Sequence, residues 1–264
     1  MNTLIFDLDD TLLWDKKSVE ESIRAAALES TAYGADAKAL VQSVRKWAPK
    51  LYAELESYTF TQDIGINPFE GLWGSFGDIH DHRFRLMGTL IKDYQRAVWK
   101  GALNDQDIQN EELAGHLAER FVFHRRHLPY VYADTFEVLE ELSSRYQLVL
   151  LTNGAPSLQH IKLQMTPQLV PYFSHIIISG AFGKGKPDES IFQYALTLSG
   201  TEKENALMIG DNLYTDILGS NRTGISNIWI NRENKPADSK VPATMQTADL
   251  WETVHAADTF FKNK

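Results

Sequence analysis

Three carboxylates follow the first apolar run of the chain and give the strongest chemical signal in the sequence. Residues 4–6 predict a buried strand of a parallel sheet, and Asp7, Asp9 and Asp10 come directly after it. Ligands of α/β proteins bind just beyond the carboxyl ends of such strands. At strand spacing Asp7 and Asp9 share one face, and two carboxylates held close together repel each other and need a cation. A solvated acidic turn is the alternative interpretation of this stretch.

A second apolar run, at residues 147–152, ends in Thr152, with Asn153 and Gly154 after it. Thr152 places a hydroxyl beside the strand end, and Gly154 lets backbone N–H groups approach an anion. The same three residues also fit an ordinary turn, so alone they do not decide between a phosphate site and a loop.

Two lysines follow a third apolar run, at residues 175–179. Lys184 and Lys186 are both close enough in sequence to neutralise a phosphoryl group and the nearby carboxylates. Pro187 comes directly after Lys186, and proline is typical of the first turn of a helix. From spacing alone the choice between the two lysines stays open.

Two further aspartates follow a fourth apolar run, at residues 205–210. Asp211 stands at the predicted strand end and can join Asp7 on a hard cation, because magnesium prefers carboxylate oxygens and water. Asp216, five residues later, falls in the first turns of a helix. It could approach the metal site or hold Lys186.

The elements that must position these groups alternate between strand and helix from residue 130 onward. Strands at 147–152, 175–179, 205–210 and 227–231 are separated by helical segments, which predicts a doubly wound parallel sheet. Residues 1–14 and 130–264 therefore form one α/β domain. Residues 234–247, with two prolines, are expected to form a loop.

Residues 15–129 read almost entirely as helix and predict an all-helical domain inserted after the first strand. Ser18, followed by Glu21, has the pattern of a helix N-cap with a capping box. Residues 65–77, rich in glycine and aromatic side chains, form a break that is either a loop facing the active site or part of the helical core. Trp14, which follows the acidic stretch at residues 7–10, is expected either to line the substrate pocket or to pack at the hinge between the two domains.

The amino-acid composition excludes several classes of function. The chain has 264 residues, 43% of them hydrophobic, no cysteine and a net charge of −9. This charge argues against partners that are nucleic acids or anionic membranes, and the lack of cysteine excludes thiol chemistry. We expect no signal peptide, because the predicted first strand begins within four residues of Met1, and no membrane span, because no apolar run reaches the roughly 20 residues that one needs. We expect a cytoplasmic protein, monomeric or homodimeric.

Four sites along the chain resemble, in order, the four motifs of the haloacid dehalogenase (HAD) superfamily of phosphohydrolases. They are Asp-x-Asp-x-Thr at residues 7–11, Thr152, Lys186-Pro187, and Gly-Asp-x4-Asp at residues 210–216. The resemblance covers the whole α/β domain and implies a HAD-like Rossmannoid core with a helical cap inserted after the first motif. It favours Lys186 over Lys184, because the superfamily lysine directly precedes proline.

The resemblance implies that Asp7 is the nucleophile and forms an aspartyl-phosphate, and that Asp9 protonates the leaving oxygen and then activates water. Dehalogenase members lack the second aspartate, so Asp9 favours phosphate chemistry. Mg²⁺ would bind Asp7, the backbone carbonyl of Asp9, and Asp211, with Asp216 as a neighbour or weak ligand. The side chains of Thr152 and Lys186 and backbone N–H groups near Leu8 and Asn153 would hold the phosphoryl oxygens.

The sequence thus predicts a magnesium-dependent phosphatase acting on a small phosphorylated metabolite. The alternatives are a phosphomutase of the same superfamily, which would be strongly activated by a bisphosphate, and a non-catalytic small-molecule-binding member. A helical cap as large as residues 15–129 is expected to exclude bulky substrates. Small phosphate esters should therefore be hydrolysed much faster than folded phosphoproteins. Phosphate release from both kinds of substrate measures this, and equal rates would contradict it.

Overall fold

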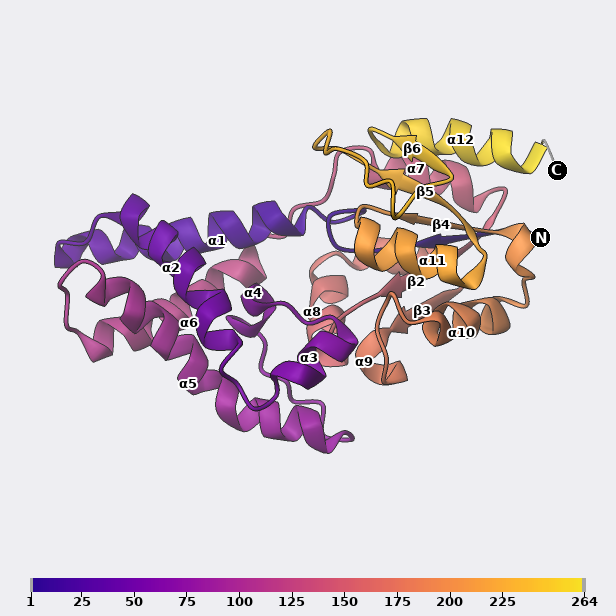
Figure 1. Cartoon of the computed structure of the whole chain (residues 1–264). Coiled ribbons are helices and arrows are strands. Elements are labelled where there is room, and N and C mark those ends of the chain that lie inside the picture. The colour runs from indigo at the N-terminus through magenta and orange to yellow at the C-terminus, as the bar shows by residue number, and fades with distance from the viewer. Residues whose placement is uncertain (1, 263–264) are drawn as a thin grey trace. The chain divides into compact units, whose positions relative to one another are not determined.

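The computed structural model describes residues 2–262, which fold into two compact units (Figure 1). The first, the core unit, comprises the chain up to Trp14, Val131–Gly154, and the chain from Thr166 onward. The second, the helical unit, comprises Asp15–Tyr130 and Ala155–Met165. The sequence-based division differs in this last segment, which it places in the α/β domain.

The core unit is built on one six-stranded parallel sheet in the order β3-β2-β1-β4-β5-β6, which confirms the predicted fold class. The strands are β1 Thr3–Phe6, β2 Gln147–Thr152, β3 His175–Ile178, β4 Ala206–Gly210, β5 Ser226–Ile230 and β6 Met245–Thr247. β1 lies between β2 and β4, where the strand order reverses. Because ligands of open α/β sheets bind at this reversal, the ends of β1 and β4 are where a site is expected.

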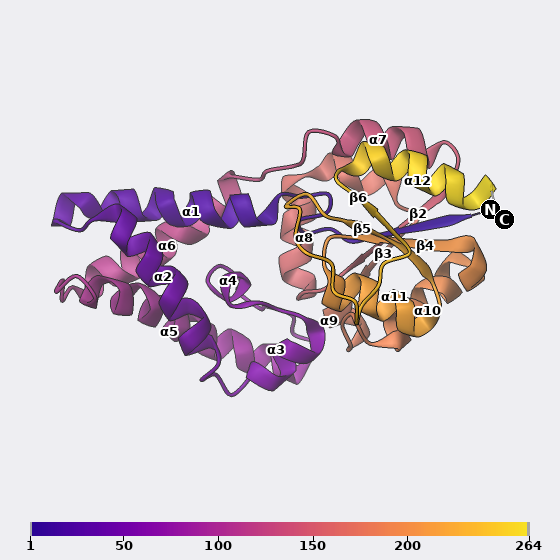
Figure 2. The ribbon, with the colours of Figure 1, turned by 45° about the horizontal axis from the view of Figure 1, so that its top comes forward.

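Helices cover both faces of the sheet (Figure 2). α7 (Thr135–Ser143) and α12 (Leu250–Lys262) pack side by side on one face, and α10 (Glu189–Ser199) and α11 (Leu218–Thr223) pack on the other. Shorter turns complete the unit: η2 Pro167–Tyr172, α9 Ser179–Phe182, η3 Lys203–Asn205 and the π-helical turn η4 Leu213–Ile217.

The expectation of a loop over residues 234–247 is wrong for the last three residues. Met245–Thr247 forms β6, which pairs with β5 in parallel and places Met245 opposite Ile228. Three residues of mixed polarity carry too little periodicity to predict a strand. The pairing is therefore decided by the adjacent edge of the sheet.

In its described residues, the helical unit consists of helices joined by turns and loops. They are α1 Asp15–Glu29, η1 Ser30–Tyr33, α2 Ala37–Tyr52, α3 Tyr58–Ile64, α4 Pro68–Gly71, α5 His82–Asn104, α6 Glu111–His127 and α8 Pro156–Met165. Trp73 and Phe76, from the glycine-rich break, are buried in its core with Trp99 and Phe121. Within residues 2–262, no helix has the length and apolar character needed to cross a bilayer.

The prediction of Ser18 as a helix N-cap is wrong. α1 begins three residues earlier, at Asp15, and Ser18 lies inside it. Its buried hydroxyl donates a hydrogen bond to the backbone carbonyl of Leu128, at 2.5 Å. This partner is 110 residues away in sequence, so no local pattern could reveal it.

Two glycines inside helices give a matched test of packing in the helical unit. A Cβ atom on Gly101 would lie 2.8 Å from the Trp47 ring, whose Nε1 is held by Asp105, whereas one on Gly115 would meet only Arg96 Nε, at 3.8 Å. We expect Gly101→Ala to lower the free energy of unfolding by about 1–3 kcal/mol. Gly115→Ala should raise it by up to about 1 kcal/mol, because alanine favours helix. Urea unfolding of both variants measures this, and equal effects would contradict the described packing.

Candidate active site

Asp7 lies directly after β1, at the reversal of the strand order. Its backbone N–H continues the pairing with β4 by donating to the carbonyl of Ile209 at 3.0 Å, and its side chain is buried. Oδ1 accepts from Lys186 Nζ at 2.6 Å, and Oδ2 accepts from Thr11 Oγ1 at 3.2 Å. Both oxygens of the carboxylate are therefore held in a defined orientation.

Lys186 is buried, and three oxygens surround its ammonium group. Nζ lies 2.6 Å from Asp7 Oδ1, 2.7 Å from Asp216 Oδ1 and 2.7 Å from the carbonyl oxygen of Leu151 in β2. Three acceptors match the three protons of an ammonium group. Lys184, the rival by spacing, is exposed, so the structure favours the lysine that precedes proline.

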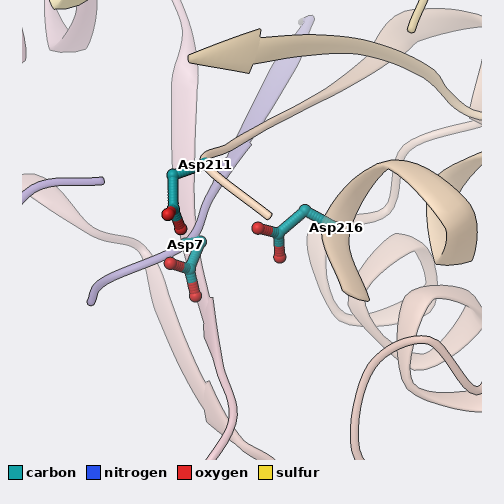
Figure 3. A group of neighbouring side chains, drawn as sticks. All are labelled: Asp7, Asp211 and Asp216. Carbon is teal, nitrogen blue, oxygen red and sulfur yellow. The ribbon is translucent and has the colours of Figure 1, made fainter. Parts of the chain in front are cut away.

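Three carboxylates point toward one another at this edge of the sheet (Figure 3). One oxygen from each of Asp7, Asp211 and Asp216 lies within 4.8 Å of the others. Set against the single ammonium of Lys186, the three carboxylates leave two negative charges unbalanced when all are ionised. Such a cluster of hard oxygen donors with excess negative charge fits a divalent cation such as Mg²⁺.

The pKa values of Asp7 and Lys186 reflect this imbalance. Burial raises the pKa of Asp7 from 3.8 to about 6, because loss of water and the charge of Asp216 together outweigh the attraction of Lys186. Burial also opposes the charge on Lys186, but the carboxylates of Asp216 and Asp7 outweigh it and raise the pKa of this lysine. Lys186 therefore stays an ammonium ion. Its single positive charge is not enough to keep the pKa of the buried Asp7 at its usual value.

Asp216, the residue with two predicted roles, contacts Lys186 and also belongs to the carboxylate group. Its Oδ2 accepts from the backbone N–H of Asn212 at 3.1 Å, and its side chain is fully buried. Gly210 makes room for it, since a Cβ there would lie 2.3 Å from Asp216 Oδ2. Asp216 is thus held in place to anchor the lysine.

The other predicted residues differ in exposure. Leu8 and Thr152 are fully buried. Asn153 forms two hydrogen bonds with the backbone of Lys186: its Oδ1 accepts from the N–H at 2.8 Å, and its Nδ2 donates to the carbonyl at 2.9 Å. Asp9 is half-buried and lies outside the carboxylate group.

The stretch after β1 is not a regular strand. β1 ends at Phe6, and Asp10 adopts a left-handed conformation with φ +62°. That the side chains of Asp7 and Asp9 share one face therefore stays a prediction. The apolar run alone could not show where the strand stops.

Three residues contribute contacts that the sequence did not assign. Thr11 Oγ1 donates to Asp7 and accepts from the backbone N–H of Asp211 at 3.1 Å, so it joins the two carboxylate-bearing segments. Trp229 Nε1 donates to the carbonyl of Asp211 at 2.8 Å, and Ser179 Oγ accepts from Gly154 N–H at 2.8 Å. Thr11 could have been found from its place in Asp-x-Asp-x-Thr, whereas the other two carry no sequence signal.

Trp14 stacks on Tyr132, with ring centroids 5.2 Å apart and an angle of 17° between the planes. The guanidinium of Arg232 lies 3.8 Å from the centroid of Tyr132 and pairs with both oxygens of Asp134, at 3.0 and 3.1 Å. These contacts join the two places where the chain leaves and re-enters the core unit, after Trp14 and at Val131. They support the hinge-packing interpretation of Trp14, which remains 39% exposed.

Comparison with known proteins places this arrangement in a family. Residues 1–224 match the family described as haloacid dehalogenase-like hydrolase. The chain belongs to the haloacid dehalogenase-like hydrolase family. The resemblance stated from the four motifs is thereby confirmed.

Similar proteins within this family include phosphatases and nucleotidases. A phosphoserine phosphatase of Thermus thermophilus is 32% identical over 96% of this chain and 97% of its own. The pyrimidine 5'-nucleotidase PynA of Streptococcus pneumoniae is 29% identical over 97% of this chain and 94% of its own. They support a phosphoric monoester hydrolase.

Solved structures agree on the fold. The magnesium-bound HAD-hydrolase YfnB of Bacillus subtilis has a TM-score of 0.66 at 22% identity, covering 97% of this chain and 98% of its own. The 2-haloacid dehalogenase of Pseudomonas syringae has a TM-score of 0.60 at the same identity. Because both identities are low, these likenesses concern the fold alone.

The raised pKa of Asp7 predicts how the metal-free protein responds to pH. Between about pH 4 and 6 the folded state retains a proton on Asp7 that the unfolded state has lost, so Asp7 costs stability as pH rises. Asp7→Asn should therefore raise the free energy of unfolding above pH 6, by about 3 kcal/mol, and give no gain near pH 4.

Urea unfolding in EDTA across this pH range measures the effect. Asp93→Asn, which removes an exposed carboxylate of α5, is the control and should change little at any pH. A metal-free Asp7→Asn protein less stable than wild type at pH 8 would show that the Lys186 contact outweighs burial and contradict this account.

Proposed function

We propose that the protein is a magnesium-dependent phosphatase of small phosphorylated metabolites that works through an aspartyl-phosphate on Asp7. The observation that carries this proposal is the buried Asp7 carboxylate, held by Lys186 and Thr11 beside Asp211 and Asp216. A carboxylate nucleophile, a fixed ammonium and a group of hard oxygen ligands are the parts that phosphoryl transfer needs.

Asp7 attacks the phosphorus atom of the ester with one carboxylate oxygen. The hydrogen bonds from Lys186 Nζ and Thr11 Oγ1 restrict its rotation, so attack requires little reorganisation. Lys186, already an ammonium ion, balances charge on the phosphoryl oxygens, assisted by backbone N–H groups near Leu8 and Asn153. Thr152 adds a hydroxyl at the end of β2.

Asp9 gives a proton to the leaving oxygen and then takes one from the water that attacks phosphorus. The released groups are the alcohol and inorganic phosphate, and Asp7 is regenerated as a carboxylate. An alkoxide leaving group needs this proton, whereas a halide does not. Asp9 therefore favours phosphate ester hydrolysis over dehalogenation, even though dehalogenases share the fold.

Mg²⁺ would be held by the carboxylates of Asp7 and Asp211 and by the backbone carbonyl of Asp9. When bound, it supplies positive charge that lowers the pKa of Asp7 and offsets the charge of the phosphate. The unbalanced charge of the carboxylate group supports this assignment. Asp216, already held by Lys186 and Asn212, would be a neighbour or weak ligand of the ion.

The substrate is a small phosphate ester in this proposal. The similar proteins act on phosphoserine and on pyrimidine nucleotides by name, so phosphorylated amino acids and nucleoside monophosphates are the first esters to test. We expect a cytoplasmic enzyme, a monomer or homodimer, with no nucleic-acid or membrane partner.

The test is phosphate release from such a panel with Mg²⁺ and with EDTA. Turnover should require the metal and fall about a thousandfold or more in Asp7→Asn. Lys186→Met should lose about a hundredfold or more, because it removes a preorganised charge. Lys184→Met, two residues earlier and exposed, is the control and should retain wild-type turnover.

Metal-independent turnover, or an active Asp7→Asn enzyme, would contradict the proposal. A phosphomutase would instead be strongly activated by a sugar bisphosphate and yield an isomeric phosphate ester. A binding protein would take up esters without releasing phosphate.

A further inference from the structure

The indole of Trp229 connects β5 to the turn that follows β4, where Asp211 lies. Trp229 is 2% exposed, and the register of the sheet places it opposite Gly210, the last residue of β4. Its Nε1 donates to the backbone carbonyl of Asp211, the next residue along the chain, at 2.8 Å. A buried indole N–H is satisfied by an acceptor, and here the acceptor belongs to a proposed ligand of Mg²⁺.

The backbone of Asp211 is held on both sides of its Cα atom. Its N–H donates to Thr11 Oγ1 at 3.1 Å, and its carbonyl accepts from Trp229. Because each peptide group is planar, these two hydrogen bonds restrict the backbone torsions of Asp211. The direction in which its carboxylate leaves the main chain is therefore set by two side chains, one from the turn after β1 and one from β5.

The other two acids of the carboxylate group are held in a different way. Asp7 and Asp216 are both bound through their side chains by the ammonium group of Lys186. Asp211, which is half-buried, is held through its backbone instead. Groups that orient a metal ligand in advance reduce the ordering that the ion must impose, so they strengthen metal binding.

Trp229 also supports the turn that carries Asp216. It forms a buried apolar cluster with Ile217 and Val241, and Leu213 packs against this cluster. Leu213 and Ile217 are the first and last residues of η4, the π-helical turn that contains Asp216. The indole therefore supports two of the three carboxylates, one through a hydrogen bond and the other through packing.

We propose that Trp229 is a positioning residue for the metal site: its indole N–H fixes the backbone of Asp211 and thereby raises the affinity for Mg²⁺. This inference rests on the proposed function, in which Asp211 is a ligand of the ion. Trp229 contacts neither the ion nor the substrate in this proposal. Its effect on the ion passes through the backbone of Asp211.

The first experiment measures Mg²⁺ binding by isothermal titration calorimetry, which needs no turnover. Trp229→Phe removes the N–H and keeps most of the apolar contact, so it should raise the dissociation constant of Mg²⁺ about tenfold. Val241→Ala is the matched control, because it weakens the same apolar cluster and leaves the hydrogen bond to Asp211 in place. Its dissociation constant should stay within about twofold of the wild-type value.

The second experiment follows the hydrolysis of para-nitrophenyl phosphate as the Mg²⁺ concentration is varied. The concentration that gives half the maximal rate should rise about tenfold in Trp229→Phe, in line with the weaker binding. At saturating Mg²⁺, kcat should stay within about threefold of wild type, because Lys186 and Thr11 still hold Asp7. A large loss of kcat that excess Mg²⁺ does not restore would overturn the inference.

If Trp229→Phe does not fold, benzothienylalanine incorporated at position 229 takes its place. This analogue keeps the two fused rings of tryptophan and has sulfur in place of the N–H group. It therefore removes the hydrogen bond without opening a cavity, and it should raise the dissociation constant of Mg²⁺ to the same extent.

The wild-type titration separates failure of this inference from failure of the proposed function. If wild type binds Mg²⁺ and the variant without the N–H binds it equally well, this inference alone is overturned. An equal rise of the dissociation constant in Val241→Ala would also overturn it, because the effect would then be one of packing. A wild-type protein that binds no Mg²⁺ would overturn the metal assignment of the proposed function, and this inference with it.

Discussion

The ammonium group of Lys186 lies between the carboxylates of Asp7 and Asp216, and the geometry of the site depends on it. Without this charge, two buried carboxylates at the end of the sheet would repel each other or take up protons. With it, one positive charge is shared between two acids, and a third acid, Asp211, stands nearby. The remaining negative charge is the physical reason to expect a divalent cation at the site.

Secondary structure supplies the positions for this arrangement. Parallel strands bring the turn after β1 and the turn after β4 to one edge, and Thr11 joins them by hydrogen bonds to Asp7 and Asp211. Asn153, at the end of β2, holds the backbone of Lys186. The segments that follow β1 and β2 thus each contribute one support to the site.

Much of this was predictable, because strands buried on both faces are apolar runs and their polar ends mark a site. β2 was predicted to the residue, and Asp7, Lys186, Asp211 and Asp216 do lie together. The failures have a common cause. The contacts of Ser18 with Leu128 and of Met245 with β5, like the placement of α8 beside Glu70, join segments far apart in sequence and leave no local pattern.

The most direct test of the account is to trap the phosphoryl group on Asp7. In Asp9→Asn the base that activates water is lost, while para-nitrophenolate leaves without a proton, so the intermediate should accumulate. The variant is mixed with para-nitrophenyl phosphate and Mg²⁺, quenched in acid and analysed by peptide mass spectrometry. The account predicts one phosphoryl group on Asp7. Phosphorylation of another residue, or release of para-nitrophenolate with no phosphorylated Asp7, would contradict it.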